Sequence, residues 1–130
     1  AYKTTVFTLS RWRNGKRPDG ALGPDGPVMP QRVIDKPPTA ELRPGQKDED
    51  SLPPYALLDR MLEALVEQEL SVAEAAALTG ADESVVADIE KKLLRAEYKR
   101  RQAPPGVKIG TRNFGRDRRY PITNFFHTGD

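Results

Sequence analysis

The chain has 130 residues, a mass of 14.5 kDa and a formal net charge of +2. It contains no cysteine and one histidine, His127, which excludes a disulfide scaffold, a thiolate metal site and a histidine-based triad. No apolar run approaches the roughly 18 residues that a membrane-spanning helix needs, and no signal peptide is visible. From the length we expect no more than one small domain. We also expect the chain to be soluble and cytoplasmic. Because the sequence begins at Ala1 without a methionine, we also expect it to be part of a longer protein.

The small net charge hides three blocks of different sign. Residues 1–40 carry seven Lys or Arg against three Asp or Glu, residues 41–90 three against thirteen, and residues 91–130 eleven against three. The basic ends suit an anionic ligand or a nucleic acid. The acidic middle is typical of solvated helices.

The first predicted element is a short amphipathic helix. Tyr2, Val6, Leu9 and Trp12 or Arg13 recur at helical spacing, and Asn14-Gly15 is a stop signal. Lys3 lies in its first turn, where the helix dipole does not favour a cation. Lys3 is therefore either an ordinary surface lysine or a residue placed there for another reason.

Two irregular stretches follow. Residues 17–30 contain two Asp-Gly turn signals, and Val33 and Ile34 are interpreted as a brief extended apolar contact. Residues 36–55, KPPTAELRPGQKDEDSLPPY, are too polar and too rich in proline to form a core. They are either a mobile functional loop or a flexible linker, and within them residues 42–51 are expected to become ordered only with ligand.

Three further helices are predicted after the loop. The first begins near Tyr55 and ends near Glu69. It carries one apolar stripe, formed by Leu57, Leu58, Met61, Leu62, Leu65 and Val66. Ser71 and Glu74 form a capping box for a short helix that runs to Leu78 before Gly80. Asp82 caps a last helix that continues to about Arg101 on an apolar face formed by Val85, Val86, Ile89, Leu93 and Ala96.

The pair of helices around Gly80 also fits a helix-turn-helix, so a small nucleic-acid-binding module is an alternative function. The second helix, however, begins ADESVVADIE. Its carboxylates oppose the electrostatic attraction to phosphates that dominates DNA affinity, so nucleic acid is the weaker interpretation.

Residues 103–130 form a basic tail with interspersed glycine and aromatic residues. The tail either binds phosphate or RNA, or packs short extended segments containing Val107, Ile109, Tyr120 and Ile122 on the outside of a domain. Composition does not choose between these possibilities.

Three separated motifs resemble one family: KPPTAELRPGQKDEDSLPPY, EYKRRQAPPGVKI and FGRDRRYPITN. In this order they resemble the C-terminal third of the bacterial, glutamine-dependent NAD synthetases, and the resemblance covers residues 1–130. It implies an α/β protein with a Rossmann-like adenine-nucleotide alpha-hydrolase fold, of which this part should be mainly α-helical with long irregular loops. It also implies an ATP-dependent ligase that amidates deamido-NAD through an adenylate, with ammonia from a glutamine amidase domain, and a homo-oligomer.

The resemblance also assigns residues. It implies that Lys3 and Thr39 bind ATP and that Lys99 binds deamido-NAD, although shorter members have His-Lys where this chain has Tyr98-Lys99. The roles of Lys36, Asp48 and Glu49, in the loop over the site, stay open.

The chain also departs from the family pattern. The glycine-rich nucleotide loop, the upstream acidic ligand for Mg²⁺ and the amidase domain are absent from these residues. The chain alone should therefore lack catalysis and bind ATP weakly.

Overall fold

The computed structural model describes residues 2–36, 52–104, 106–112 and 117–122. These residues form helices and turns and no strand, which confirms the prediction of a mainly helical part with irregular connections. They belong to two compact units, Ala1–Ala56 and Leu57–Asp130, where length predicted one domain. None of the described helices is long and apolar enough to cross a membrane.

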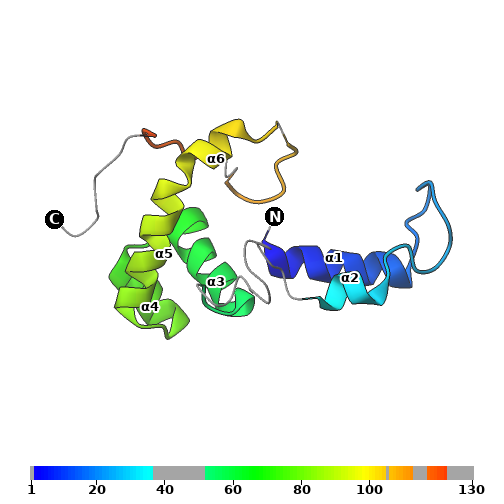
Figure 1. Cartoon of the computed structure of the whole chain (residues 1–130), viewed down its shortest axis with the longest axis horizontal. Helices are drawn as coiled ribbons and strands as arrows, with labels where there is room; N and C mark the ends of the chain where they lie inside the picture. The colour runs from blue at the N-terminus through cyan, green and yellow to red at the C-terminus, as the bar shows by residue number, and fades with distance from the viewer. Residues whose placement is uncertain (1, 37–51, 105, 113–116, 123–130) are drawn as a thin grey trace, which may run out of the picture. The chain divides into compact units, whose positions relative to one another are not determined.

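The first unit is built around α1 (Lys3–Gly15), with the short helix α2 (Gln31–Asp35) beside it (Figure 1). The sequence predicted α1 correctly but not the surroundings of its apolar residues. No residue of α1 is buried, and Val6, Leu9 and Trp12 are 44%, 59% and 48% exposed. Helical periodicity identifies such a stripe without showing what covers it.

The prediction of an extended contact at Val33 and Ile34 was wrong, since both residues lie in α2. The Gln31 amide donates to both carboxylate oxygens of Asp35 at 2.9 Å, a side-chain pair across one helical turn. Ile34 is buried and Val33 is exposed. The helical backbone of α2 therefore replaces the predicted extended segment, and of the two residues only Ile34 is buried.

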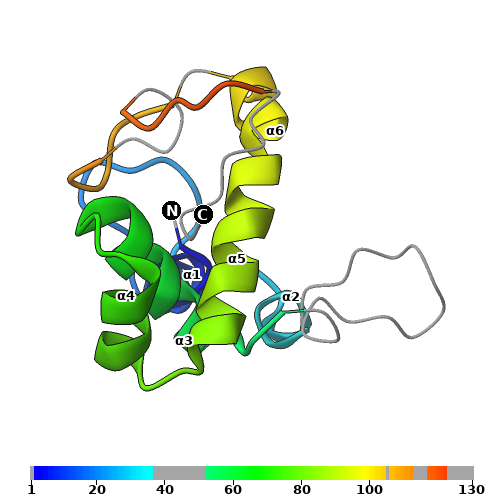
Figure 2. The same ribbon diagram turned by 90° about the vertical axis from the view of Figure 1, so that its left-hand side faces the viewer.

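The second unit packs four helical segments around one apolar core (Figures 1 and 2). They are α3 (Tyr55–Leu62), which begins at the end of the first unit, the π-helical turn η2 (Glu63–Glu67), α4 (Val72–Thr79) and α5 (Glu83–Arg95). The predicted stripes supply seven buried residues of this core, Leu58, Met61, Leu65, Val66, Val86, Ile89 and Leu93. Three buried alanines that were not predicted, Ala64, Ala75 and Ala76, lie in the same core.

The helix boundaries follow local hydrogen bonding. The predicted capping box is confirmed: Glu74 N–H donates to Ser71 Oγ at 3.3 Å, and Ser71 N–H donates to the Glu74 carboxylate at 2.9 Å. Gly80 ends α4 in the left-handed conformation at φ 72°. Asp82 occupies the N-cap position of α5, but its side chain makes no cap hydrogen bond, which corrects that prediction.

The prediction of one helix from Asp82 to about Arg101 was also wrong. The chain leaves helical geometry at Ala96 (φ −82°, ψ 7°) and resumes as α6 (Glu97–Gln102). The Leu93 carbonyl, in the last turn of α5, accepts from Arg100 Nη1 at 2.8 Å. Arg100 thus satisfies one of the carbonyls that a helix end leaves without an intrahelical partner.

Candidate functional site

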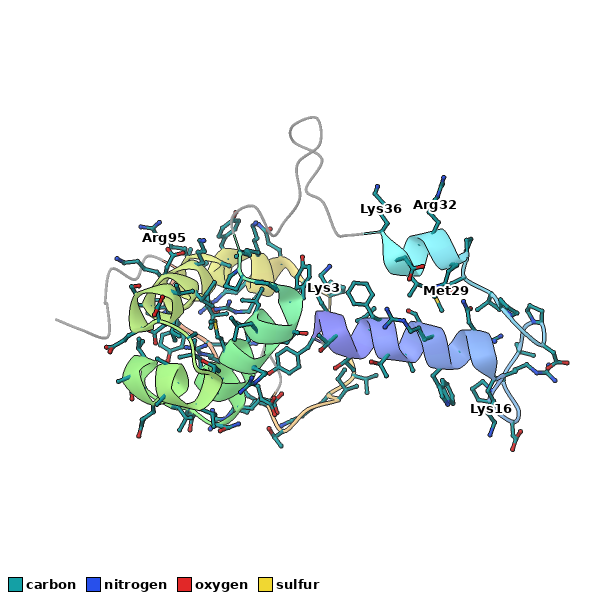
Figure 3. All side chains as sticks on the ribbon, turned by 90° about the horizontal axis from the view of Figure 1, so that it is seen from below. Lys3, Lys16, Met29, Arg32, Lys36 and Arg95 are labelled. Atoms are coloured by element: carbon teal, nitrogen blue, oxygen red, sulfur yellow. The ribbon has the colours of Figure 1, made fainter. Side chains whose placement is uncertain are left out.

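Lys3, the first residue of α1, has an exposed side chain. Its ammonium lies 5.7 Å from the centre of the Tyr55 ring, within the range of a cation–π interaction. Figure 3 labels Lys3 at the beginning of the helix. The aromatic contact supplies a local reason for the position of this cation, and it leaves the ammonium at the surface.

The loop after α1 is held by side chains of the helix end. Asn14 accepts from Val28 N–H and Met29 N–H, each at 3.0 Å, and donates to the Met29 carbonyl at 2.7 Å. Arg13 donates to the carbonyls of Pro24 and Gly26 at 3.0 and 3.3 Å. These bonds fix the loop backbone at Pro24, Gly26, Val28 and Met29.

Lys36 is the C-cap residue of α2, and its N–H donates to the Arg32 carbonyl at 3.0 Å. Figure 3 shows the Arg32 and Lys36 side chains on α2, pointing away from α1. Thr39, Asp48 and Glu49 lie outside the described residues. Their predicted membership of a loop over the site stays a prediction.

Lys99 lies in the last turn of α6, together with Arg100 and Arg101. Its side chain is exposed, with the ammonium 5.9 Å from the centre of the Tyr98 ring. Lys3 belongs to the first unit and Lys99 to the second, and each is placed only within its own unit.

A buried carboxylate that sequence analysis did not single out lies two residues before Lys99. Glu97 is 1% exposed, and its two oxygens pair with Arg100 and Arg101. Burial alone would raise the pKa of Glu97. The hydrogen bonds from Arg100 and Arg101, the charge of Arg100 and the backbone N–H of Tyr120 outweigh burial and hold that pKa below its ordinary value.

Residues 111 and 112 are attached to the chain at the end of η2. Glu67 accepts hydrogen bonds from the N–H and the hydroxyl of Thr111, and Glu69 pairs with Arg112 at 2.7 Å. The π-helical turn brings these carboxylates to the segment: Gln68 N–H donates to the Glu63 carbonyl at 3.1 Å, and Glu69 follows in the left-handed region at φ 55°.

The family model described as NAD synthase matches residues 1–103. The chain belongs to the NAD synthase family. It is 49% identical over 123 residues to the glutamine-dependent NAD(+) synthetase of Rhodobacter capsulatus, covering 95% of this chain and 22% of the relative. The enzyme of the same name from Thermotoga maritima is 46% identical over 125 residues, which cover 96% of this chain and 20% of the relative. The chain thus spans about a fifth of the length of these relatives.

A solved structure agrees with this family assignment. The glutamine-dependent NAD⁺ synthetase of Acinetobacter baumannii, in complex with adenosine diphosphate, matches all of this chain and 20% of its own length, with 38% identity and a TM-score of 0.57. This similarity confirms the predicted fold class, a mainly helical part of a Rossmann-like adenine-nucleotide alpha-hydrolase fold.

Proposed function

We propose that this chain is the C-terminal part of the ammonia ligase domain of a glutamine-dependent NAD synthase. In the proposed reaction, the nicotinate carboxylate of deamido-NAD attacks the α-phosphorus of ATP, giving an adenylate and releasing pyrophosphate. Ammonia derived from glutamine then attacks the activated carbonyl and displaces AMP. The match of the NAD synthase family over residues 1–103 is the observation that carries this proposal.

Lys3 and Thr39 are proposed to bind ATP. Lys3 places an exposed ammonium group at the first residue of the 13-residue helix α1. The free backbone N–H groups at a helix N-terminus also favour an anion. A cation and a hydroxyl can stabilise the charge that develops as pyrophosphate leaves. The adenosine diphosphate in the A. baumannii structure supports the use of an adenine nucleotide.

Lys99 is proposed to bind deamido-NAD. The exposed Lys99 ammonium lies in a helical turn whose other two cations, Arg100 and Arg101, are engaged by Glu97. An ammonium at this position can pair with an anionic dinucleotide while its helix stays fixed to the core.

The resemblance also implies Mg²⁺. The described residues contain no group of three His, Cys, Asp or Glu side chains that could hold a metal ion. As the resemblance implies, we propose that the Mg²⁺ ligands belong to the part of the ligase domain upstream of this chain, and that Mg²⁺ would supply charge neutralisation on the phosphates. The amidase domain and a homo-oligomeric assembly are likewise proposed as partners.

The negative charge of α5 argues against the alternative function, a nucleic-acid-binding module. The first turn of α5 contains Glu83, and Asp88 and Glu90 follow on the same helix. Phosphates would meet negative charge at a recognition helix of this kind.

The test is an assay of the full-length protein that contains this chain, supplied with ATP, deamido-NAD and either ammonia or glutamine. Formation of NAD, AMP and pyrophosphate in equal amounts is expected. Absence of NAD with both nitrogen sources would overturn the proposal. Calorimetry of the 130-residue chain with ATP should show weak or no binding, and submicromolar affinity would show that the ATP site is misplaced.

A further inference from the structure

Glu97 is a charged side chain buried as deeply as the apolar core. It is 1% exposed, and its partners Arg100 and Arg101 have side chains that are 11% and 42% exposed. Removing a carboxylate from water is costly unless good partners compensate for it. The position of Glu97 therefore requires the two guanidinium groups of α6.

The same cluster reaches a residue far along the chain. Arg101 Nη2 donates to the Tyr120 carbonyl at 2.8 Å, and Arg101 Nε donates to the Glu97 carboxylate at 3.2 Å. The Tyr120 backbone is thus joined to the buried Glu97 through the Arg101 guanidinium group. Figure 2 shows residues 117–122, in red, beside α6, in agreement with this bond.

The segment held in this way carries further positive charge. Arg118 lies 5.1 Å from the centre of the Tyr120 ring, and its Nη1 is buried without a hydrogen-bond partner among the described residues. Arg119 follows it. The clamp therefore holds two guanidinium groups in a segment fastened to α6, the helix that carries Lys99.

We propose that Glu97 and Arg101 are positioning residues, which clamp Tyr120 so that residues 117–122 and Lys99 form one binding surface for the anionic dinucleotide. This inference rests on the proposed function. Glu97 does not contact the ligand, because its carboxylate is buried and fully engaged. Its effect is to order α6 and residues 117–122 before the ligand binds. This order lowers the conformational-entropy cost of binding deamido-NAD.

The decisive variant is Arg101→Ala in the full-length protein, because Arg101 is partly exposed and its loss leaves the apolar core intact. We expect the amide of Tyr120 to exchange with solvent faster and KM for deamido-NAD to rise about tenfold, the effect of losing one charge-assisted hydrogen bond. KM for ATP should rise much less. The matched control is Arg95→Ala, an exposed arginine at the end of α5, which should change neither quantity.

Two further variants separate geometry from charge. Arg101→Lys keeps the charge, but one ammonium cannot reproduce the fork that joins Glu97 to Tyr120, so it should resemble Arg101→Ala. Glu97→Gln should likewise speed exchange of the Tyr120 amide and raise KM for deamido-NAD. If this variant does not fold, the result for Arg101→Ala tests the proposal. Unchanged exchange at Tyr120 in Arg101→Ala would overturn the clamp, and faster exchange with unchanged KM for deamido-NAD would overturn its positioning role.

Failure of the proposed function gives a different pattern. If Lys99→Ala leaves KM for deamido-NAD unchanged, the site assignment is wrong, and the positioning role falls with it whatever Tyr120 shows. If Lys99→Ala raises that KM and Arg101→Ala does not, the proposed function stands and this inference alone is overturned.

Discussion

The two units of the chain are stabilised in different ways. The second unit buries the apolar stripes of α3, η2, α4 and α5 in a common core. In the first unit, α1 buries no residue, and the following loop is fastened by Asn14 and Arg13 through hydrogen bonds to backbone carbonyl and N–H groups. Helical periodicity predicted the apolar stripe of α1 as well as the stripes of the second unit. Only the structure shows that the stripes of the second unit are buried within this chain and that the stripe of α1 is not.

The largest difference between the two units is expected in how much their ion pairs contribute to the free energy of unfolding. Glu97 is buried between two arginines, whereas Arg17 and Asp25, 2.9 Å apart, have side chains that are 41% and 84% exposed. Glu97→Ala should lower the free energy of unfolding by about 3–5 kcal/mol, because it leaves Arg100 buried without its counter-charge. Asp25→Ala should cost about 1 kcal/mol or less. Chemical denaturation of both variants measures the difference, and equal effects would contradict the comparison.

The apolar residues provide the next largest contrast. Met61 is fully buried in α3, and Leu9 is 59% exposed on α1. Met61→Ala should cost about 2–5 kcal/mol through lost burial and a residual cavity. Leu9→Ala should cost under about 1 kcal/mol in this chain. If thermal unfolding shows Leu9→Ala to be as damaging as Met61→Ala, the stripe of α1 is covered and the comparison fails.

Acid should act first on the second unit. Hydrogen bonds from the Ser71 side chain and backbone lower the pKa of Glu74, and those from the arginines outweigh burial at Glu97 to lower its pKa also. Because the unfolded chain binds these protons more readily, the stabilisation is complete above the ordinary value of 4.5 and is lost as pH falls below it. Glu97→Gln should flatten the dependence of stability on pH below that value. An unchanged acid denaturation profile would contradict this account.

Sequence reasoning succeeded where the signal was local. The capping box of Ser71 and Glu74 and the buried face of α5 depend on residues three or four positions apart. Local signals also failed, since Val33 and Ile34 lie in α2 and the Asp82 side chain makes no cap hydrogen bond. Tertiary partners were outside the reach of sequence reasoning altogether. The bonds from Arg101 to Tyr120 and from Thr111 to Glu67 span 19 and 44 residues, and no local pattern marks them.

The site residues illustrate the same limit. Lys3 and Lys99 came from motif resemblance, and the structure adds their exposure and their aromatic neighbours. The buried Glu97 beside Lys99 was missed, although its spacing to Arg100 and Arg101 is that of helical ion pairs. That spacing is common on solvated helices, so it does not reveal burial.

The most direct test of the central claim is the steady-state kinetics of Lys99→Ala in the full-length protein, with Lys3→Ala beside it. If Lys99 holds deamido-NAD, its loss removes a charge-assisted hydrogen bond of about 1.5–3 kcal/mol and raises KM for deamido-NAD about tenfold to a hundredfold. Lys3→Ala should act mainly on KM for ATP. An unchanged KM and turnover for deamido-NAD in Lys99→Ala would contradict the site assignment.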